Sequence, residues 1–182
     1  RFPYSTQSAE AVFGSQFILP ENGPESEDGS RYDPTPDLPD FPSYGENVYY
    51  YRYDNVAMVV LNTHYWYSSK LDPDTPVGGN PHGYIMDNQL QWLKKTVDRL
   101  EKDSSIDHIF VTTHTPVLPN SGHVKDGMWH SGNNAIRPVV GGKPVDKGMH
   151  ERRDELLELL VNQSKKTVAV LTGDEHNYCR TE

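Results

Sequence analysis

The sequence predicts a layered α/β fold, because apolar strand-like runs alternate with helical patterns along the chain. The runs at 109–113 and 167–171 are rich in β-branched residues, and helical patterns at 86–100 and 151–161 precede them. Strands that alternate with helices imply parallel crossovers, in which the helices cover the sheet. We therefore expect neighbouring parallel strands whose carboxyl ends meet at one edge of the sheet.

The first part of the chain, residues 1–47, is expected to be an irregular, loop-rich segment of the same domain as residues 48–182. It shows no helical or strand periodicity, and its prolines alternate with acidic and small residues. The acidic cluster at 25–29 lacks the ligand spacing of an EF-hand, which favours a solvated loop over a calcium site. Aromatic residues are expected to hold this segment in place: Phe13, Phe17, Tyr32 and Phe41.

The regular elements begin with a β-hairpin, in which the runs 48–53 and 56–62 flank the polar turn Asp54-Asn55. The next element is an amphipathic helix, because apolar residues recur at three- and four-residue steps. They are Met86, Leu90, Leu93, Val97 and Leu100. The long Gly-rich loop 114–150 follows the strand 109–113, and loops of that length in a compact domain are usually functional.

Composition and charge exclude some classes of function. With 182 residues, the chain is long enough for one domain with a hydrophobic core. Its net charge of −9 argues against nucleic acid as the main partner. No run approaches the ~20 apolar residues of a membrane span. The single cysteine, Cys179, excludes a disulfide framework within residues 1–182.

Candidate metal ligands follow two of the predicted strands. Asp174 and His176 come after the strand 167–171 and Gly173, and His114 comes directly after the strand 109–113. In an extended segment, residues i and i+2 project to the same side, so Asp174 and His176 are expected to reach one small volume. Carboxylate oxygen and imidazole nitrogen suit Zn, Mn or Fe. On position alone, His114 could equally cap its strand through hydrogen bonds.

Three motifs carry a resemblance to a known family. They are Gln89-Leu90-Gln91-Trp92-Leu93 in the first helix, His114-Thr115-Pro116 after a strand, and the stretch from Gly173-Asp174-Glu175-His176 to Arg180. The chain from Tyr49 to Arg180 resembles the C-terminal half of a calcineurin-like metallophosphoesterase, in the neighbourhood of the purple acid phosphatases. The opening Arg1-Phe2-Pro3-Tyr4-Ser5 is also similar to a segment of that family. The resemblance implies an α/β/β/α sandwich, present as an incomplete C-terminal portion.

The resemblance also implies a function, the hydrolysis of phosphate mono- or diesters by metal-activated hydroxide. This chain would supply part of a site for two metal ions (Fe, Mn or Zn, with Ca also compatible) about 3.5–4 Å apart. His176 would bind the first metal, and His114 and Asp174 the second, where Asp174 stands at a position usually held by histidine. His123 would contact the phosphate and protonate the leaving group, although an exposed loop histidine is an equal alternative.

The resemblance further implies partners and leaves alternatives. The family's bridging aspartate and other first-half ligands are absent upstream of Tyr49, so we expect them on a missing N-terminal half of the same domain. The expected partners are that half and a phosphorylated substrate, and a periplasmic or secreted location follows from the resemblance alone. One alternative is a non-catalytic binding or structural remnant of the same fold, and another is a hydrolase that uses a single metal.

The remaining histidines and tryptophans have weaker claims. His130 and His150 share the loop of His123, and His64 could line the same crevice, although no motif indicates it. No functional role is expected for the others. Structural or exposed roles are expected for His82 and His108, and packing roles for Trp66 and Trp92.

Overall fold

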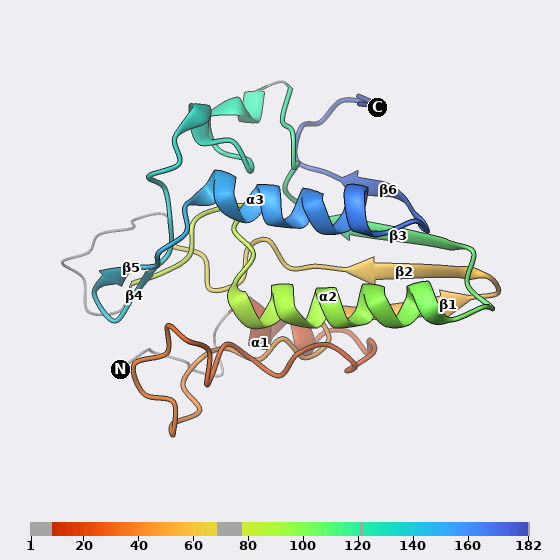
Figure 1. Cartoon of the computed structure of the whole chain (residues 1–182). Helices are drawn as coiled ribbons and strands as arrows, with labels where there is room; N and C mark the ends of the chain where they lie inside the picture. Colours follow the sequence, from red (N-terminus) through yellow and green to blue (C-terminus); the bar gives the residue numbers. More distant parts are fainter. Residues whose placement is uncertain (1–8, 69–77, 121, 182) are drawn as a thin grey trace.

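The computed structural model of the chain describes residues 9–68, 78–120 and 122–181, and it confirms the α/β class predicted from the sequence. Four strands form one mixed sheet in the order β1-β2-β3-β6, and helices α2 and α3 lie side by side along it (Figure 1). The opening motif at residues 1–5 lies outside the described residues. No helix in the described part of the chain is long and apolar enough to cross a bilayer.

The sheet has the pairing that the sequence predicted. The strands β1 (Tyr49–Tyr53) and β2 (Val56–Val60) form the antiparallel hairpin. Next to β2 lies β3 (His108–Thr113), in parallel, and β6 (Thr167–Thr172) runs parallel to β3. The carboxyl ends of β2, β3 and β6 therefore meet at one edge of the sheet.

Two helices cover one face of this sheet. The helix α2 (Asp87–Lys102) buries the apolar stripe that its periodicity predicted, and α3 (Met149–Leu157) continues as a π-helical turn over Glu158–Gln163. The side chains of Ala57, Val59, Ile109 and Val111 are fully buried in the core with the helices. Burial of these side chains beneath α2 and α3 fixes which face of each strand points inward.

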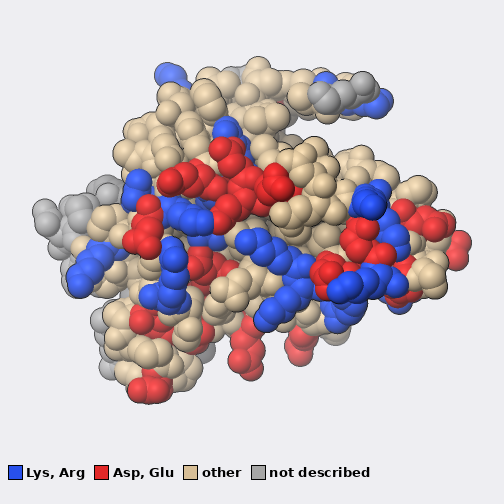
Figure 2. Space-filling view, in the orientation of Figure 1, with Lys and Arg blue, Asp and Glu red and all other residues tan. Residues whose placement is uncertain are grey.

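A buried arginine joins the two helices through ion pairs. Arg152 of α3 is buried, and its guanidinium pairs with Asp87 at the start of α2 and with Glu155 at 3.4 Å. Arg31 pairs with the same Asp87 at 3.3 Å. Figure 2 shows acidic and basic groups interleaved over this face of the molecule.

Short elements occur in both segments that the sequence predicted as loops. The helix α1 (Ala9–Gly14) lies in residues 1–47, and the ribbon of β4 (Val139–Val140) and β5 (Lys143–Pro144) lies in the loop 114–150. Two 3₁₀ turns, Gly122–Lys125 and His130–Gly132, also lie in that loop. These elements are too short to produce a periodic pattern, so tertiary contacts decide them.

Only part of the aromatic anchoring predicted for residues 1–47 is confirmed. Phe41 is buried against Trp66, and Tyr32 packs partly against the core. Phe13 and Phe17 are exposed and pack against each other, so their predicted anchoring role is wrong. A carboxylate anchors α1 instead, because Glu10 Oε1 accepts a hydrogen bond from the backbone N–H of Trp66 at 2.8 Å.

The acidic cluster at 25–29 is not a fully solvated loop, which corrects the expectation from its composition. Glu27 is completely buried, and its carboxylate accepts the backbone N–H groups of Asn88 and Gln89 at 3.0 and 3.1 Å and the Tyr44 hydroxyl at 2.8 Å. The N-cap residue Met86 makes no side-chain cap hydrogen bond. Glu27 therefore caps α2 from a distant part of the chain and satisfies N–H groups that the helix leaves free.

Glu27 should make folding depend on pH. Burial raises the pKa of Glu27 from 4.5 to about 7, against the lowering effect of its hydrogen bonds to Asn88, Tyr44 and Gln89. A raised pKa in the folded state favours folding below pH 4.5, and this contribution is lost as the pH rises through about 7. The loss amounts to about 3 kcal/mol. Urea unfolding at pH 4.5 and pH 8 should show this dependence in the wild type, and Glu27→Gln should lack it.

The other face of the sheet and its β6 edge remain partly open. Tyr51 and Leu171 point away from the helices and are 46% and 45% exposed. Val168 of β6 is 51% exposed. A strand that is apolar on both faces is typical of the interior of a parallel sheet, whereas β6 lies at the edge. The described residues thus form one four-stranded layer with a partly exposed apolar face.

Candidate metal centre

The ends of β3 and β6 bring an imidazole and a carboxylate together. The strands are in parallel register to Thr113 and Thr172, and the N–H of Gly173 donates to the carbonyl of His114 at 3.0 Å. This backbone bond holds the two turns side by side. The distance from His114 Nε2 to Asp174 Oδ1 is 3.3 Å, so the predicted proximity of these two side chains is found.

The Asp174 carboxylate lies among three histidines. Besides His114, His82 Nε2 lies 3.5 Å and His123 Nδ1 3.6 Å from Asp174 Oδ2. The Asp174 side chain is only 12% exposed, and Oδ2 is buried without a hydrogen-bond partner among the described residues. A buried carboxylate oxygen without a donor is costly, which favours a cationic ligand at this position.

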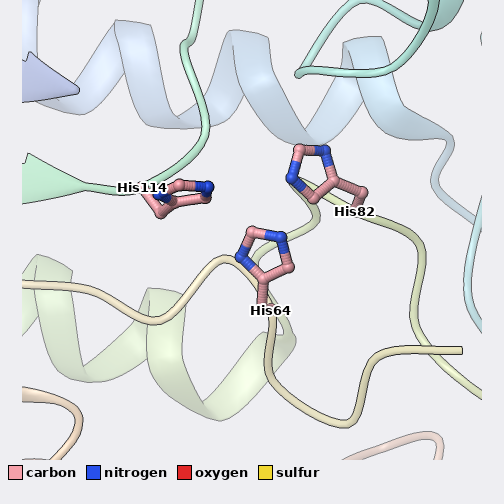
Figure 3. A group of neighbouring side chains, drawn as sticks. All are labelled: His64, His82 and His114. Carbon is pink, nitrogen blue, oxygen red and sulfur yellow. The ribbon is translucent and has the colours of Figure 1, made fainter. Parts of the chain in front are cut away.

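His64 completes a cluster of imidazoles with His82 and His114. These side chains come from the loops after β2, before α2 and after β3, and Figure 3 shows their rings converging. Ring centroids are 4.2 Å apart for His64 and His82, and 4.9 Å apart for His64 and His114. One nitrogen from each ring can be chosen so that all three lie within 4.8 Å of one another.

Neighbouring groups hold this histidine cluster in place. Asn62 Oδ1 accepts the backbone N–H of His64 at 2.8 Å, which fixes the turn that follows β2. The Thr115 hydroxyl lies 3.4 Å from His82 Nε2, and His130 Nε2 lies 3.0 Å from the His82 carbonyl. His130 therefore supports the loop that carries His82.

Burial keeps two of these imidazoles neutral. It lowers the pKa of His64 to about 4, with further lowering by the neighbouring His82 and His114. Burial also lowers the pKa of His82, against the opposing charge of Asp174. At neutral pH both rings therefore keep a lone pair for a metal ion or a hydrogen bond.

His176 does not share this arrangement, and the same-side argument for it is wrong. Asp174 and His176 have φ values of 72° and 53°, so the segment after β6 is a left-handed bend and not an extended strand. The alternation expected of a strand does not apply there. His176 is exposed, and its ring centroid lies 6.5 Å from that of His123. Its assignment as a metal ligand stays a prediction.

His123 lies at the rim of the cluster on a 3₁₀ turn. Its Nδ1 lies 3.1 Å from Asp126 Oδ1, and its side chain is about one-third exposed. This position allows contact with both Asp174 and solvent. His150 stacks on Trp129 and contacts its carbonyl at 2.7 Å, and His108 is exposed at the amino end of β3.

The structure brings His64 and His82 into the site, although no motif indicates either residue. His64 follows a buried strand, as His114 does, and that position alone offered a weak signal. His82 lies in a Gly- and Pro-containing loop without periodicity. The sequence therefore indicated only a structural or exposed role for it and not its place in the cluster. Trp66 and Trp92 have the predicted packing roles, since Trp66 packs on Phe41 and Trp92 donates its indole N–H to Asn22.

A hollow of about 270 Å³ opens beside His64 and His114, with Phe13 and Asn47 also in its wall. A larger hollow of about 590 Å³ lies between residues 24–39 and α2 and contains none of these histidines. Of these two hollows, only the smaller one borders the histidine cluster. Comparison with family models, with curated proteins and with solved structures finds no match to this chain, so its function is inferred from the site itself.

Proposed function

We propose that this chain supplies part of the active site of a metal-dependent phosphoesterase. The observation that carries the proposal is the contact between His114 and Asp174, at the ends of two neighbouring parallel strands. Nitrogen and oxygen donors of this kind suit Zn, Mn or Fe, and the buried Asp174 Oδ2 without a hydrogen-bond partner among the described residues fits a bound cation.

Each residue has a defined task in this proposal. His114 and Asp174 hold a metal ion. His123 reaches the site from its rim, where it donates a proton to the leaving oxygen of the substrate. When bound there, the ion would polarise the phosphoryl group as a Lewis acid and would lower the pKa of a water molecule. The hollow beside His64 and His114 admits the ester.

The proposal includes a second layer of the fold. The partly exposed face around Tyr51 and Leu171, and the open edge of β6, support a further segment of the same protein packing there. That segment would complete the α/β/β/α sandwich and bring the remaining ligands of a two-metal site. A covered β6 would also bury Val168, which its apolar character favours.

A hydrolase with one metal ion is the second candidate. The observation that favours it is the cluster of His64, His82 and His114, because these imidazoles together with Asp174 offer enough donors for one ion. The two candidates differ in the number of metal ions per active protein. Elemental analysis of the active complete protein should give two ions for the first candidate and one for the second.

The experiment that tests the function compares the complete gene product with its His114→Ala variant on a generic aryl phosphate. We expect hydrolysis by the wild type and a loss of at least about a hundredfold in the variant, because one metal ligand is removed. His108→Ala, at the other end of the same strand, is the matched control and should keep full activity. Equal activity in His114→Ala would show that His114 takes no part in the hydrolysis, and no activity in the wild type would favour the non-catalytic alternative.

The chain of residues 1–182 alone provides a further prediction. We expect no measurable turnover from it, because a two-metal site needs a bridging carboxylate that these residues do not supply in the family pattern. The same aryl phosphate assay measures this. Strong activity of residues 1–182 by themselves would contradict the two-metal arrangement and favour the single-metal candidate.

A further inference from the structure

We infer that His64 and His82, together with His114 and Asp174, form a binding site for one transition-metal ion of the Zn²⁺ type. This inference deepens the proposed function, because it names two ligands that no motif indicates and a class of metal. The sequence indicated only His114, Asp174 and His176 as metal ligands of this chain. His64 and His82 add two further imidazoles.

The contacts of Asp174 have the spacing that a metal site needs. In a tetrahedral zinc site with bonds of about 2.0–2.1 Å, neighbouring donor atoms lie about 3.3 Å apart. The distance is 3.3 Å from His114 Nε2 to Asp174 Oδ1, and 3.5 Å from His82 Nε2 to Asp174 Oδ2. Each of these histidine nitrogens therefore already lies near the expected separation from the carboxylate oxygen that it contacts.

His64 supplies the fourth donor. The chosen nitrogens of His64, His82 and His114 lie within 4.8 Å of one another, so the widest pair must approach by about 1.5 Å to reach tetrahedral spacing. The torsion between an imidazole ring and its Cβ has a broad energy well, so modest ring rotations can bring the nitrogens closer. Figure 3 shows the three rings facing a common space.

A second observation supports the site independently of the histidine spacing. Asp174 Oδ2 is buried, and no donor among the described residues forms a hydrogen bond with it. A cation among the imidazoles would satisfy that oxygen.

The donor set also selects the metal. Three imidazole nitrogens and one carboxylate suit Zn²⁺, Co²⁺ or Ni²⁺, whereas Mg²⁺ and Ca²⁺ prefer oxygen donors. The carboxylate and imidazole donors indicated by the sequence suit Zn, Mn or Fe alike. The addition of His64 and His82 shifts the expected preference toward Zn²⁺.

The experiment is a metal titration of the 182-residue chain, without substrate. We expect one equivalent of Zn²⁺ to bind in competition with a chromophoric chelator, and Co²⁺ to give the intense visible absorption of a four-coordinate site. His64→Ala and His82→Ala should each weaken Zn²⁺ binding by at least about tenfold to a hundredfold. His150→Ala and His108→Ala are matched controls and should bind as the wild type does.

A second readout avoids any effect of the variants on folding. Nitrogen NMR of the wild-type imidazoles should show Zn²⁺-dependent shifts for His64 and His82, and none for His150. Unchanged resonances of His64 and His82 at saturating Zn²⁺, or a loss of binding in His176→Ala with none in His64→Ala, would overturn the inference. If the complete protein binds Zn²⁺ through His64 and His82 but does not hydrolyse the aryl phosphate, only the proposed function is rejected. If it hydrolyses the ester while His64 and His82 do not bind Zn²⁺, only this inference is rejected.

Discussion

Asp174→Asn is expected to lower kcat/KM of the complete protein for an aryl phosphate by about a thousandfold. The substitution keeps the shape of the side chain and removes the charge that lies 3.3 Å from His114 and 3.5 Å from His82. A carboxylate binds a metal ion in its deprotonated form, and its negative charge then balances part of the ion's positive charge. A loss of several kcal/mol of transition-state stabilisation corresponds to that factor.

Two controls make this result specific. Asp107→Asn changes an exposed carboxylate at the far end of β3 and should leave the rate unchanged. Asp126→Asn removes the charge that lies 3.1 Å from His123 and keeps the Asp174 carboxylate, so it should cause a smaller loss. Metal content is measured in parallel by mass spectrometry. A rate for Asp174→Asn within about threefold of the wild type would show that the carboxylate has no part in hydrolysis.

Glu27→Ala is expected to destabilise the fold by about 4 kcal/mol. The change leaves the N–H groups of Asn88 and Gln89 and the hydroxyl of Tyr44 without their acceptor, in a region where Glu27 itself is fully buried. Each buried polar group left unsatisfied costs about 1–3 kcal/mol, and the cavity adds to this. Urea unfolding followed by circular dichroism measures the difference.

The same loop offers a matched control. Glu25 is exposed two residues before Glu27, and Glu25→Ala should change the free energy of unfolding by less than about 0.5 kcal/mol. A loss below about 1 kcal/mol in Glu27→Ala would mean that water replaces the carboxylate at the start of α2. In that case the remote cap would contribute little to the stability of the helix.

Long periodic elements could be predicted from the sequence. The stripe of α2 from Leu90 to Leu100, the hairpin around Asp54-Asn55 and the apolar runs of β3 and β6 all have the expected type and nearly the expected bounds. Local patterns suffice here because a helix or strand that buries one face repeats its apolar residues with its own structural period. The short α1 and the β4-β5 ribbon have no such pattern, and contacts such as that between Glu10 and Trp66 decide them.

The candidate site also has a part that the sequence predicted and a part that it did not. That His114 and Asp174 lie close together follows from two adjacent parallel strands, and the sequence indicated both strands. The position of His176 could not be predicted, because the left-handed bend after β6 breaks the alternation on which the argument depended. The position of His82 depends on how its loop crosses the sheet edge, to which local sequence gives no clue.

The sequence by itself therefore determined the α/β class, the principal strands and helices, and one imidazole–carboxylate pair at strand ends. Only the tertiary structure decided that Glu27 caps α2 and that His64 and His82 join His114. The physical reason is the separation in sequence of the residues that interact. Hydrophobic periodicity can be recognised within one helix or strand. The burial of Glu27 and the convergence of three loops depend on segments that are distant in sequence.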